Sequence, residues 1–91
     1  MNKQEVIKTL DKYIDMIKDL IEDLRTRQDL GLLCLDAGRI DGIKTGLVAL
    51  YSVLDYDLMC DPAIESAYQF IQYTLNNEAF SIYKARLHEL Y

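Results

Sequence analysis

The sequence predicts an all-α fold, a helical bundle formed by a single domain over residues 1–91. Apolar residues recur at alternating spacings of three and four along most of the chain, which is the period of an amphipathic helix. Pro62, the only proline, follows Asp61, an arrangement typical of a helix start. Hydrophobic residues make up 51% of the chain and charged residues 27%, a composition that supports a folded core. We expect three main helices and a short C-terminal helix.

The first predicted helix covers residues 3–28 and has one apolar face. Because this face is wider than the seam of a two-stranded coiled coil, we expect it to contact at least two neighbouring helices. Aspartates at four-residue spacing mark the other side, which we interpret as a solvent-exposed face balanced by lysine and arginine. The apolar positions are Val6, Leu10, Tyr13, Ile17, Leu20 and Leu24, and the aspartates are Asp11, Asp15, Asp19 and Asp23.

The second predicted helix covers residues 32–54. Asp29 and Gly31 mark the break before it, and Asp36 is a second candidate N-cap if the string GLLCLDAG contains an irregular turn. At 100° per residue, five large apolar side chains fall within about 80° of arc and form a face that we expect to be buried. These residues are Ile40, Ile43, Leu47, Leu50 and Leu54.

A row of small residues lies about 120° away from that face. Each glycine inside a helix costs about 1 kcal/mol relative to alanine, so the row indicates that another helix approaches this backbone closely. We therefore expect the second helix to have two buried faces and to lie at the centre of the bundle, and we expect the substitution Gly42→Ala to be destabilising. The row consists of Gly38, Gly42, Gly46 and Ala49.

The third predicted helix covers residues 62–75 and begins at the Asp61–Pro62 pair. The aspartate carboxylate accepts hydrogen bonds from free N–H groups, and a proline at the first helical position loses no bond. After Asn76 and Asn77 the apolar positions are rotated by about 100° from the earlier ones. The sequence therefore predicts a break or kink at these asparagines and a short helix over residues 78–90.

The sequence carries no signature of catalysis. Its single histidine, His88, falls in the last predicted turn, and no nucleophile, base and orienting acid can be assembled around it. Cys34 and Cys60 lack the C-x-x-C spacing of metal and redox sites, and we interpret them as small core residues. We expect a protein that is not an enzyme and that has no metal ion or cofactor.

Charge and hydropathy restrict the expected partners. The formal net charge of -5 disfavours contact with the phosphates of a nucleic acid. The longest apolar run, residues 47–54, is much shorter than the ~20 residues that span a bilayer, so we expect no membrane contact. The charged beginning of the sequence, MNKQEVIKTLDKY, lacks the pattern of a signal peptide. Together with the unpaired cysteines, these features predict a cytoplasmic protein.

A tyrosine-rich acidic segment follows the second predicted helix. Residues 47–82 contain five acidic residues and neither lysine nor arginine, which gives this segment a formal charge of -5. Tyrosine supplies contact area at low entropic cost, and carboxylates attract basic partners, so the segment predicts a protein interface. The alternative interpretation assigns the acids to helix caps and the tyrosines to a half-buried core. The candidate partner-binding residues are Tyr51, Asp55, Tyr56, Asp57, Asp61, Glu65, Tyr68 and Tyr73.

The string GRIDGIKTGLVAL, residues 38–50, resembles the glycine-spaced helical segment G-x-I-D-G-L of small helical proteins from phages and mobile elements. The resemblance implies a helical hairpin or bundle that binds another protein in an accessory, regulatory or inhibitory role. Gly46 departs from that pattern because it extends the row beyond two glycines. The resemblance assigns no functional residue.

Our main hypothesis from the sequence is a small acidic interaction protein, a phage or mobile-element inhibitor or regulator, that forms a homodimer and binds a basic surface of a host protein. One alternative is an immunity or antitoxin-like protein that neutralises a cognate toxin. A second alternative is a small-ligand-binding protein whose pocket lies along the glycine row, where the exposed backbone would admit a flat or anionic ligand.

Overall fold

The computed structural model describes the whole chain, Met1–Tyr91, and is helical apart from short connections. The prediction of an all-α fold is therefore confirmed. The elements are α1 (Lys3–Thr26), α2 (Leu30–Ser52), the single-turn α3 (Tyr56–Met59), α4 (Pro62–Tyr73), a π-helical segment (Thr74–Ala79) and α5 (Phe80–Leu90).

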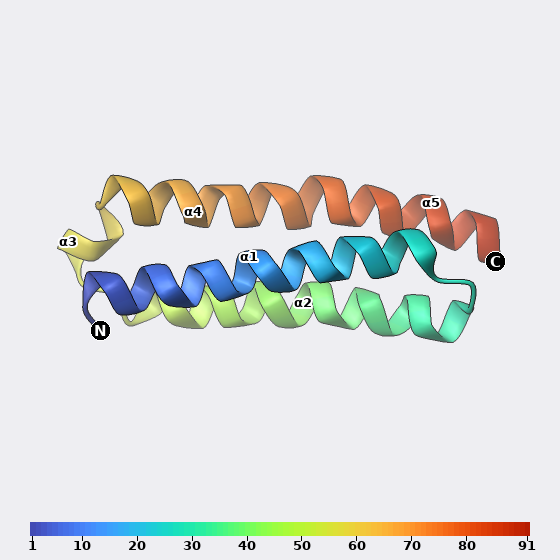
Figure 1. The fold of residues 1–91 in the computed structure, drawn as a ribbon, viewed down its shortest axis with the longest axis horizontal. Coiled ribbons are helices and arrows are strands. Elements are labelled where there is room, and N and C mark those ends of the chain that lie inside the picture. The colour runs from blue at the N-terminus through green and yellow to red at the C-terminus, as the bar shows by residue number, and fades with distance from the viewer.

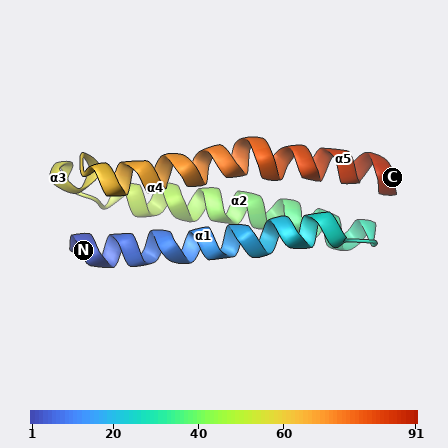
Figure 2. The ribbon, with the colours of Figure 1, turned by 45° about the horizontal axis from the view of Figure 1, so that its top comes forward.

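Three helical stretches lie side by side along the length of the molecule (Figure 1). α1 and α2 run in opposite directions, and the stretch from α4 to α5 runs in the same direction as α1; Figure 2 shows the same arrangement from a second angle. The molecule measures 46 × 17 × 17 Å. α3 and the N-terminus lie at one end, whereas the C-terminus and the α1–α2 connection lie at the other.

The core runs along the axis between these stretches, and the apolar faces predicted for the first two helices form most of it. Of the predicted face of α1, Tyr13 alone is only half-buried. All five residues of the face predicted for the second helix are buried, and the last of them, Leu54, lies just beyond the end of α2. The stretch from α4 to α5 covers both helices. The buried apolar residues are Val6, Leu10, Ile17, Leu20 and Leu24 of α1; Leu33, Ile40, Ile43, Leu47 and Leu50 of α2; and Leu54, Ile64, Ile71, Leu75 and Ala79 after it.

Side-chain caps determine where the helices begin. Asn2 caps α1, and the Asp29 carboxylate accepts a hydrogen bond from the Leu32 N–H at 3.0 Å at the start of α2. The predicted break at Asp29 is thus confirmed, although α2 begins at Leu30, two residues earlier than expected. Asp36 lies inside the continuous helix α2 and is not a cap, so no irregular turn interrupts this segment.

The predicted break at Asn76 and Asn77 is corrected to a π-helical segment within a continuous helical stretch. A π-helix makes i→i+5 hydrogen bonds, so a single π turn accommodates one residue more than an α turn. One residue corresponds to 100° of α-helix, which is the rotation that the apolar positions show in the sequence. The Asn77 side chain also donates a hydrogen bond to the Tyr73 carbonyl at 3.0 Å, which supports the backbone of this turn.

Candidate protein-binding surface

The connection between α2 and α4 forms the single-turn helix α3, which the sequence did not predict. The Asp55 carboxylate accepts a hydrogen bond from the Leu58 N–H at 2.9 Å and caps this turn. Asp61 caps α4, as predicted, through the N–H groups of Ala63 at 2.9 Å and Ile64 at 3.3 Å. Four helical residues are too few to show a hydrophobic period, so only the aspartate before them signalled a helix.

Two of the candidate tyrosines are packed against each other inside this end of the molecule. The rings of Tyr51 and Tyr68 have centroids 4.1 Å apart at an interplanar angle of 35°. The Tyr51 hydroxyl donates a hydrogen bond to the Met59 carbonyl at 3.3 Å, and burial raises the pKa of this phenol. Tyr51 and Tyr68 are half-buried, so they hold α3 and α4 against α2.

Asp61 is also engaged within the chain. Its carboxylate lies 2.9 Å from the Lys3 ammonium. The hydrogen bond from Lys3, together with those from the backbone of α4, lowers the pKa of Asp61 below its ordinary range despite partial burial. Asp61 therefore joins the start of α1 to the start of α4. The alternative interpretation therefore fits four of the candidates. Asp55 and Asp61 are helix caps, and Tyr51 and Tyr68 belong to the half-buried core.

The other four candidates project into solvent. Tyr56 is 79% exposed and Tyr73 is 68% exposed. Asp57 and Glu65 are exposed and form no ion pair within 4.0 Å. Tyr73 lies eight residues after Glu65, about 12 Å further along the helix at 1.5 Å per residue. The structure therefore gathers only part of the predicted set at one end. We call four of the exposed residues there the α3 surface: Tyr56, Asp57, Met59 and Glu65.

Gly38, Gly42 and Ala49 of the glycine row are exposed and Gly46 is half-buried, so the second buried face expected for α2 is not formed by another helix of the same chain. A Cβ atom placed on Gly38 or Gly42 meets no other atom within 4 Å, and Ala49 is exposed. Only Gly46 has a close neighbour, because a Cβ there would lie 2.6 Å from the Tyr13 hydroxyl oxygen. α2 thus has one buried face and does not lie at the centre of the molecule.

A shallow hollow of about 270 Å³ lies beside Gly42, between α1 and α2. Pockets for small ligands measure about 300 to 1,000 Å³ and present polar groups that are free to bind. The one cation of the lining, the Arg39 guanidinium, is paired with Asp23 and Asp36, and Asp19 adds a negative charge without an ion-pair partner. The hollow therefore does not favour the anionic ligand that the sequence suggested. It is lined by Tyr13, Met16, Asp19, Arg39, Gly42 and Ile43.

Both cysteines are free and exposed. The prediction that Cys34 and Cys60 are core residues is therefore wrong. Cys34 lies on the solvent side of α2, and Cys60 follows α3. Residue type and spacing gave no indication that the two cysteines are exposed, because free cysteine is more often buried than exposed.

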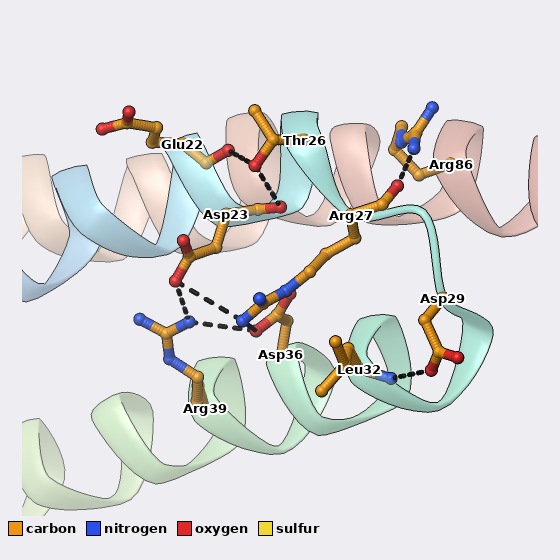
Figure 3. A network of polar contacts seen from close by, with 9 residues as sticks. All are labelled: Glu22, Asp23, Thr26, Arg27, Asp29, Leu32, Asp36, Arg39 and Arg86. Carbon is orange, nitrogen blue, oxygen red and sulfur yellow. Dashed lines mark hydrogen bonds and ion pairs between the residues drawn. The ribbon is translucent and has the colours of Figure 1, made fainter.

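A polar network that the sequence pattern did not predict joins the end of α1 to the beginning of α2 (Figure 3). Its centre is Asp36, whose side chain is 0% exposed. Arg27 binds this carboxylate with two donors, Nε at 2.8 Å and Nη2 at 3.0 Å. Arg39 Nη1 donates to Asp36 at 3.0 Å and to Asp23 at 2.7 Å. Two aspartates and two arginines thus balance each other's charge.

Arginine pairing decides the ionisation of this buried carboxyl. Burial by itself raises the pKa of Asp36, but the hydrogen bonds from Arg27 and Arg39 outweigh it and hold the pKa below its ordinary range. The hydrogen bond to Asp36 raises the pKa of Arg27, and the hydrogen bonds to Asp23 and Asp36 raise the pKa of Arg39. The network links α1 to α2. Arg86 connects α5 to the same region, because it donates a hydrogen bond to the Arg27 carbonyl.

Comparison of the chain with protein-family models, with curated proteins and with solved structures finds no match. The relationship to phage and mobile-element proteins therefore stays a prediction. None of the helices combines the length and the apolar character needed to cross a membrane.

Proposed function

We propose that this chain is a small protein-interaction module that binds a basic protein surface through the α3 surface. The observation that carries the proposal is the exposure of Tyr56, whose side chain is 79% accessible in a helix of one turn. An exposed tyrosine offers a partner both an apolar ring and a polar hydroxyl group. Tyrosine is also enriched among the residues that dominate binding energy at interfaces.

The charge around Tyr56 indicates the chemistry of the partner. Asp57 and Glu65 have no cationic neighbour within ion-pair distance, whereas Asp61 is neutralised by Lys3. Unpaired carboxylates beside an exposed aromatic ring steer lysine- and arginine-rich surfaces toward it. A bound module would exclude the anionic ligands of such a surface, so the role that we propose is that of an inhibitor or regulator.

The test is affinity capture from cells of the native host, with mass spectrometry of the captured proteins. The double variant Asp57→Lys/Glu65→Lys should lose the partner, and Tyr56→Ala should weaken capture at least about tenfold, as expected for a central interface residue. Capture by the unaltered chain should also fall when the ionic strength rises from about 0.1 M to about 1 M, because the Debye length shortens from ~10 Å to ~3 Å.

The matched control is Asp11→Lys/Asp15→Lys, which makes the same charge change on the exposed side of α1. It should leave capture intact. Equal loss in both double variants would show nonspecific attraction by net charge, and equal retention would show that the α3 surface is not used. Either result would contradict the proposal.

A further inference from the structure

The hollow between α1 and α2 has walls that are mostly apolar. The Tyr13 side chain reaches from α1 across to α2, so that a Cβ on Gly46 would lie 2.6 Å from its hydroxyl oxygen. Met16, which is 48% exposed, lines the hollow from α1, and Ile43 lines it from α2. Gly42 leaves the space open because it has no side chain. We call this feature the Gly42 hollow.

The charge of the Gly42 hollow is negative. Its one cation, the Arg39 guanidinium, is paired with Asp23 at 2.7 Å and with Asp36 at 3.0 Å. Asp19 also lines the hollow, is exposed and forms no ion pair within 4.0 Å. The closest lysine on the same side of α1, Lys12, lies about 10 Å from Asp19 at 1.5 Å per residue. The hollow therefore combines an apolar wall with a carboxylate that no cation of the chain neutralises.

We propose that the Gly42 hollow binds an organic ammonium ion, with its nitrogen beside the Asp19 carboxylate and its apolar body against Tyr13 and Met16. The carboxylate accepts a charge-assisted hydrogen bond from the ammonium group. Aromatic rings also attract organic cations. An anion would meet Asp19 without a free cation to bind it, and a neutral molecule would gain only the apolar contact.

The volume of the hollow limits the size of the ligand. At about 270 Å³ it lies just below the range of about 300 to 1,000 Å³ for drug-sized ligands, so the ligand has few atoms. A free primary amine and the lysine side chain of a protein share this chemistry. The site differs from the α3 surface, because Tyr13, Met16 and Gly42 lie within α1 and α2 and α3 lies at the end of the molecule.

The first experiment titrates the chain with phenethylammonium chloride and follows the backbone amide signals by nuclear magnetic resonance. We expect saturable shifts centred on Met16, Asp19 and Gly42, with a dissociation constant of about 1 to 10 mM, as befits a ligand of few atoms. Phenethyl alcohol has the same ring without the charge and should bind at least about fivefold more weakly. Hydrocinnamate, an anion of similar size, should not bind.

Two pairs of variants assign the contacts. Asp19→Asn should weaken binding about five- to tenfold, whereas Asp15→Asn, one turn away, should change it by less than about twofold because solvent and salt screen the more distant charge. Gly42→Leu adds a side chain to the lining and should abolish binding, whereas Gly38→Leu adds it outside the lining and should leave binding unchanged. A Cβ has open space at both glycines, so both variants should retain their helical circular dichroism.

Three results would overturn the proposal. The first is the absence of saturable shifts around Gly42 up to about 50 mM phenethylammonium. The second is equal binding of phenethyl alcohol, which would remove the role of charge. The third is an equal loss of affinity in Asp15→Asn and Asp19→Asn, or shifts spread along the acidic side of α1, because the cation would then be attracted by net charge alone.

A second titration distinguishes the two sources of the ammonium group. N-acetyl-lysine N-methylamide presents a lysine side chain as a protein does, and butylammonium presents the same alkyl chain as a free amine. Tighter binding of the lysine derivative would identify a protein side chain, and tighter binding of butylammonium would identify a small molecule. Asp57→Lys/Glu65→Lys should bind both probes as the unaltered chain does, so a failure of the α3 surface leaves this test intact. Weaker probe binding in this double variant would overturn the separation of the two sites.

Discussion

Asp36 lies in an environment that is unusual for an aspartate. It shares the buried side of α2 with Leu33, Ile40 and Leu47, at 0% exposure. An aspartate is almost never fully buried unless it is paired. A carboxylate in phase with an apolar stripe was therefore a signal in the sequence that two nearby arginines, Arg27 and Arg39, would reach inward. The conditional assignment of Asp36 as a second candidate N-cap does not use this signal.

Removing this charge should destabilise the fold. Asp36→Asn leaves the Arg27 guanidinium without its two-donor partner, and we expect the free energy of unfolding to fall by about 2 to 3 kcal/mol. The loss is below that of a fully buried pair because both arginines keep contact with solvent and Asp23 remains to bind them. Urea unfolding followed by circular dichroism measures it. Asp15→Asn, at an exposed site, should change stability by less than about 0.5 kcal/mol.

The network also predicts that the stability of the fold falls at acidic pH. The pKa of Asp36 is lower in the folded chain than its ordinary value of about 4. Its stabilisation is therefore complete above about pH 4 and is lost as the pH falls through the folded pKa. Between about pH 6 and about pH 3 the unaltered chain should lose more stability than Asp36→Asn, which cannot titrate there. Parallel losses in urea unfolding at the two pH values would show that Asp36 is not the titrating group.

At the scale of elements, the π-helical segment reconciles two apolar stripes that a regular helix would leave about 100° apart. The segment carries one residue too many for an α-helix. Deletion of Asn77 should therefore convert Thr74–Ala79 into regular α-helix without rotating α5 away from the core. We expect a folded chain whose stability changes by less than about 1 kcal/mol.

The matched control is deletion of Gln69, an exposed residue inside the regular helix α4. This deletion rotates Ile64 against Ile71 by about 100° and should expose one of the two buried side chains, at a cost of several kcal/mol. Thermal unfolding compares the two deletions. An equal loss of stability in both deletions would show that the π segment does not determine which side of α5 faces the core.

The exposure of Gly42 reverses the expectation that Gly42→Ala destabilises the fold. Because nothing lies within 4 Å of a Cβ at Gly42, Gly42→Ala should stabilise the monomer by about 1 kcal/mol through helix propensity. Gly46→Ala should gain less, since its Cβ must displace the Tyr13 hydroxyl. Urea unfolding at dilutions where the chain is monomeric measures both changes. A destabilised Gly42→Ala monomer would restore the original interpretation of a close contact inside the chain.

At the scale of the whole molecule, sequence periodicity predicted the all-α class, the buried faces of the first two helices and the helix starts at Asp29 and Asp61. For α2 it also predicted a second buried face, along the glycine row, which no helix of the chain covers. Small residues are compatible both with a close helix contact and with solvent, so their spacing did not show which of the two applies. The row around Gly42 consequently looked buried but faces solvent.

The candidate site was only partly predicted, because contacts between helices change its charge. A count of charges along residues 47–82 cannot include cations that packing brings from another helix. Lys3 neutralises Asp61, and Arg25 lies 3.5 Å from Glu78. The segment is therefore less acidic in the folded molecule than in the sequence, and its unpaired carboxylates at the α3 end reduce to Asp57 and Glu65 beside the cap residue Asp55.

The position of the α3 surface yields a last prediction. α3 lies at one end of the 46 Å long molecule, whereas the α1–α2 connection and the Asp36 network beside it lie at the other. Partner binding and the stability that the network provides should therefore be separable. Asp57→Lys/Glu65→Lys should lose the basic partner but unfold at nearly the same urea concentration as the unaltered chain. Asp36→Asn should unfold at a lower urea concentration but retain capture under conditions in which it is folded. Urea unfolding and affinity capture of the same two variants measure both properties, and loss of both properties in Asp57→Lys/Glu65→Lys would contradict the assignment of the α3 surface.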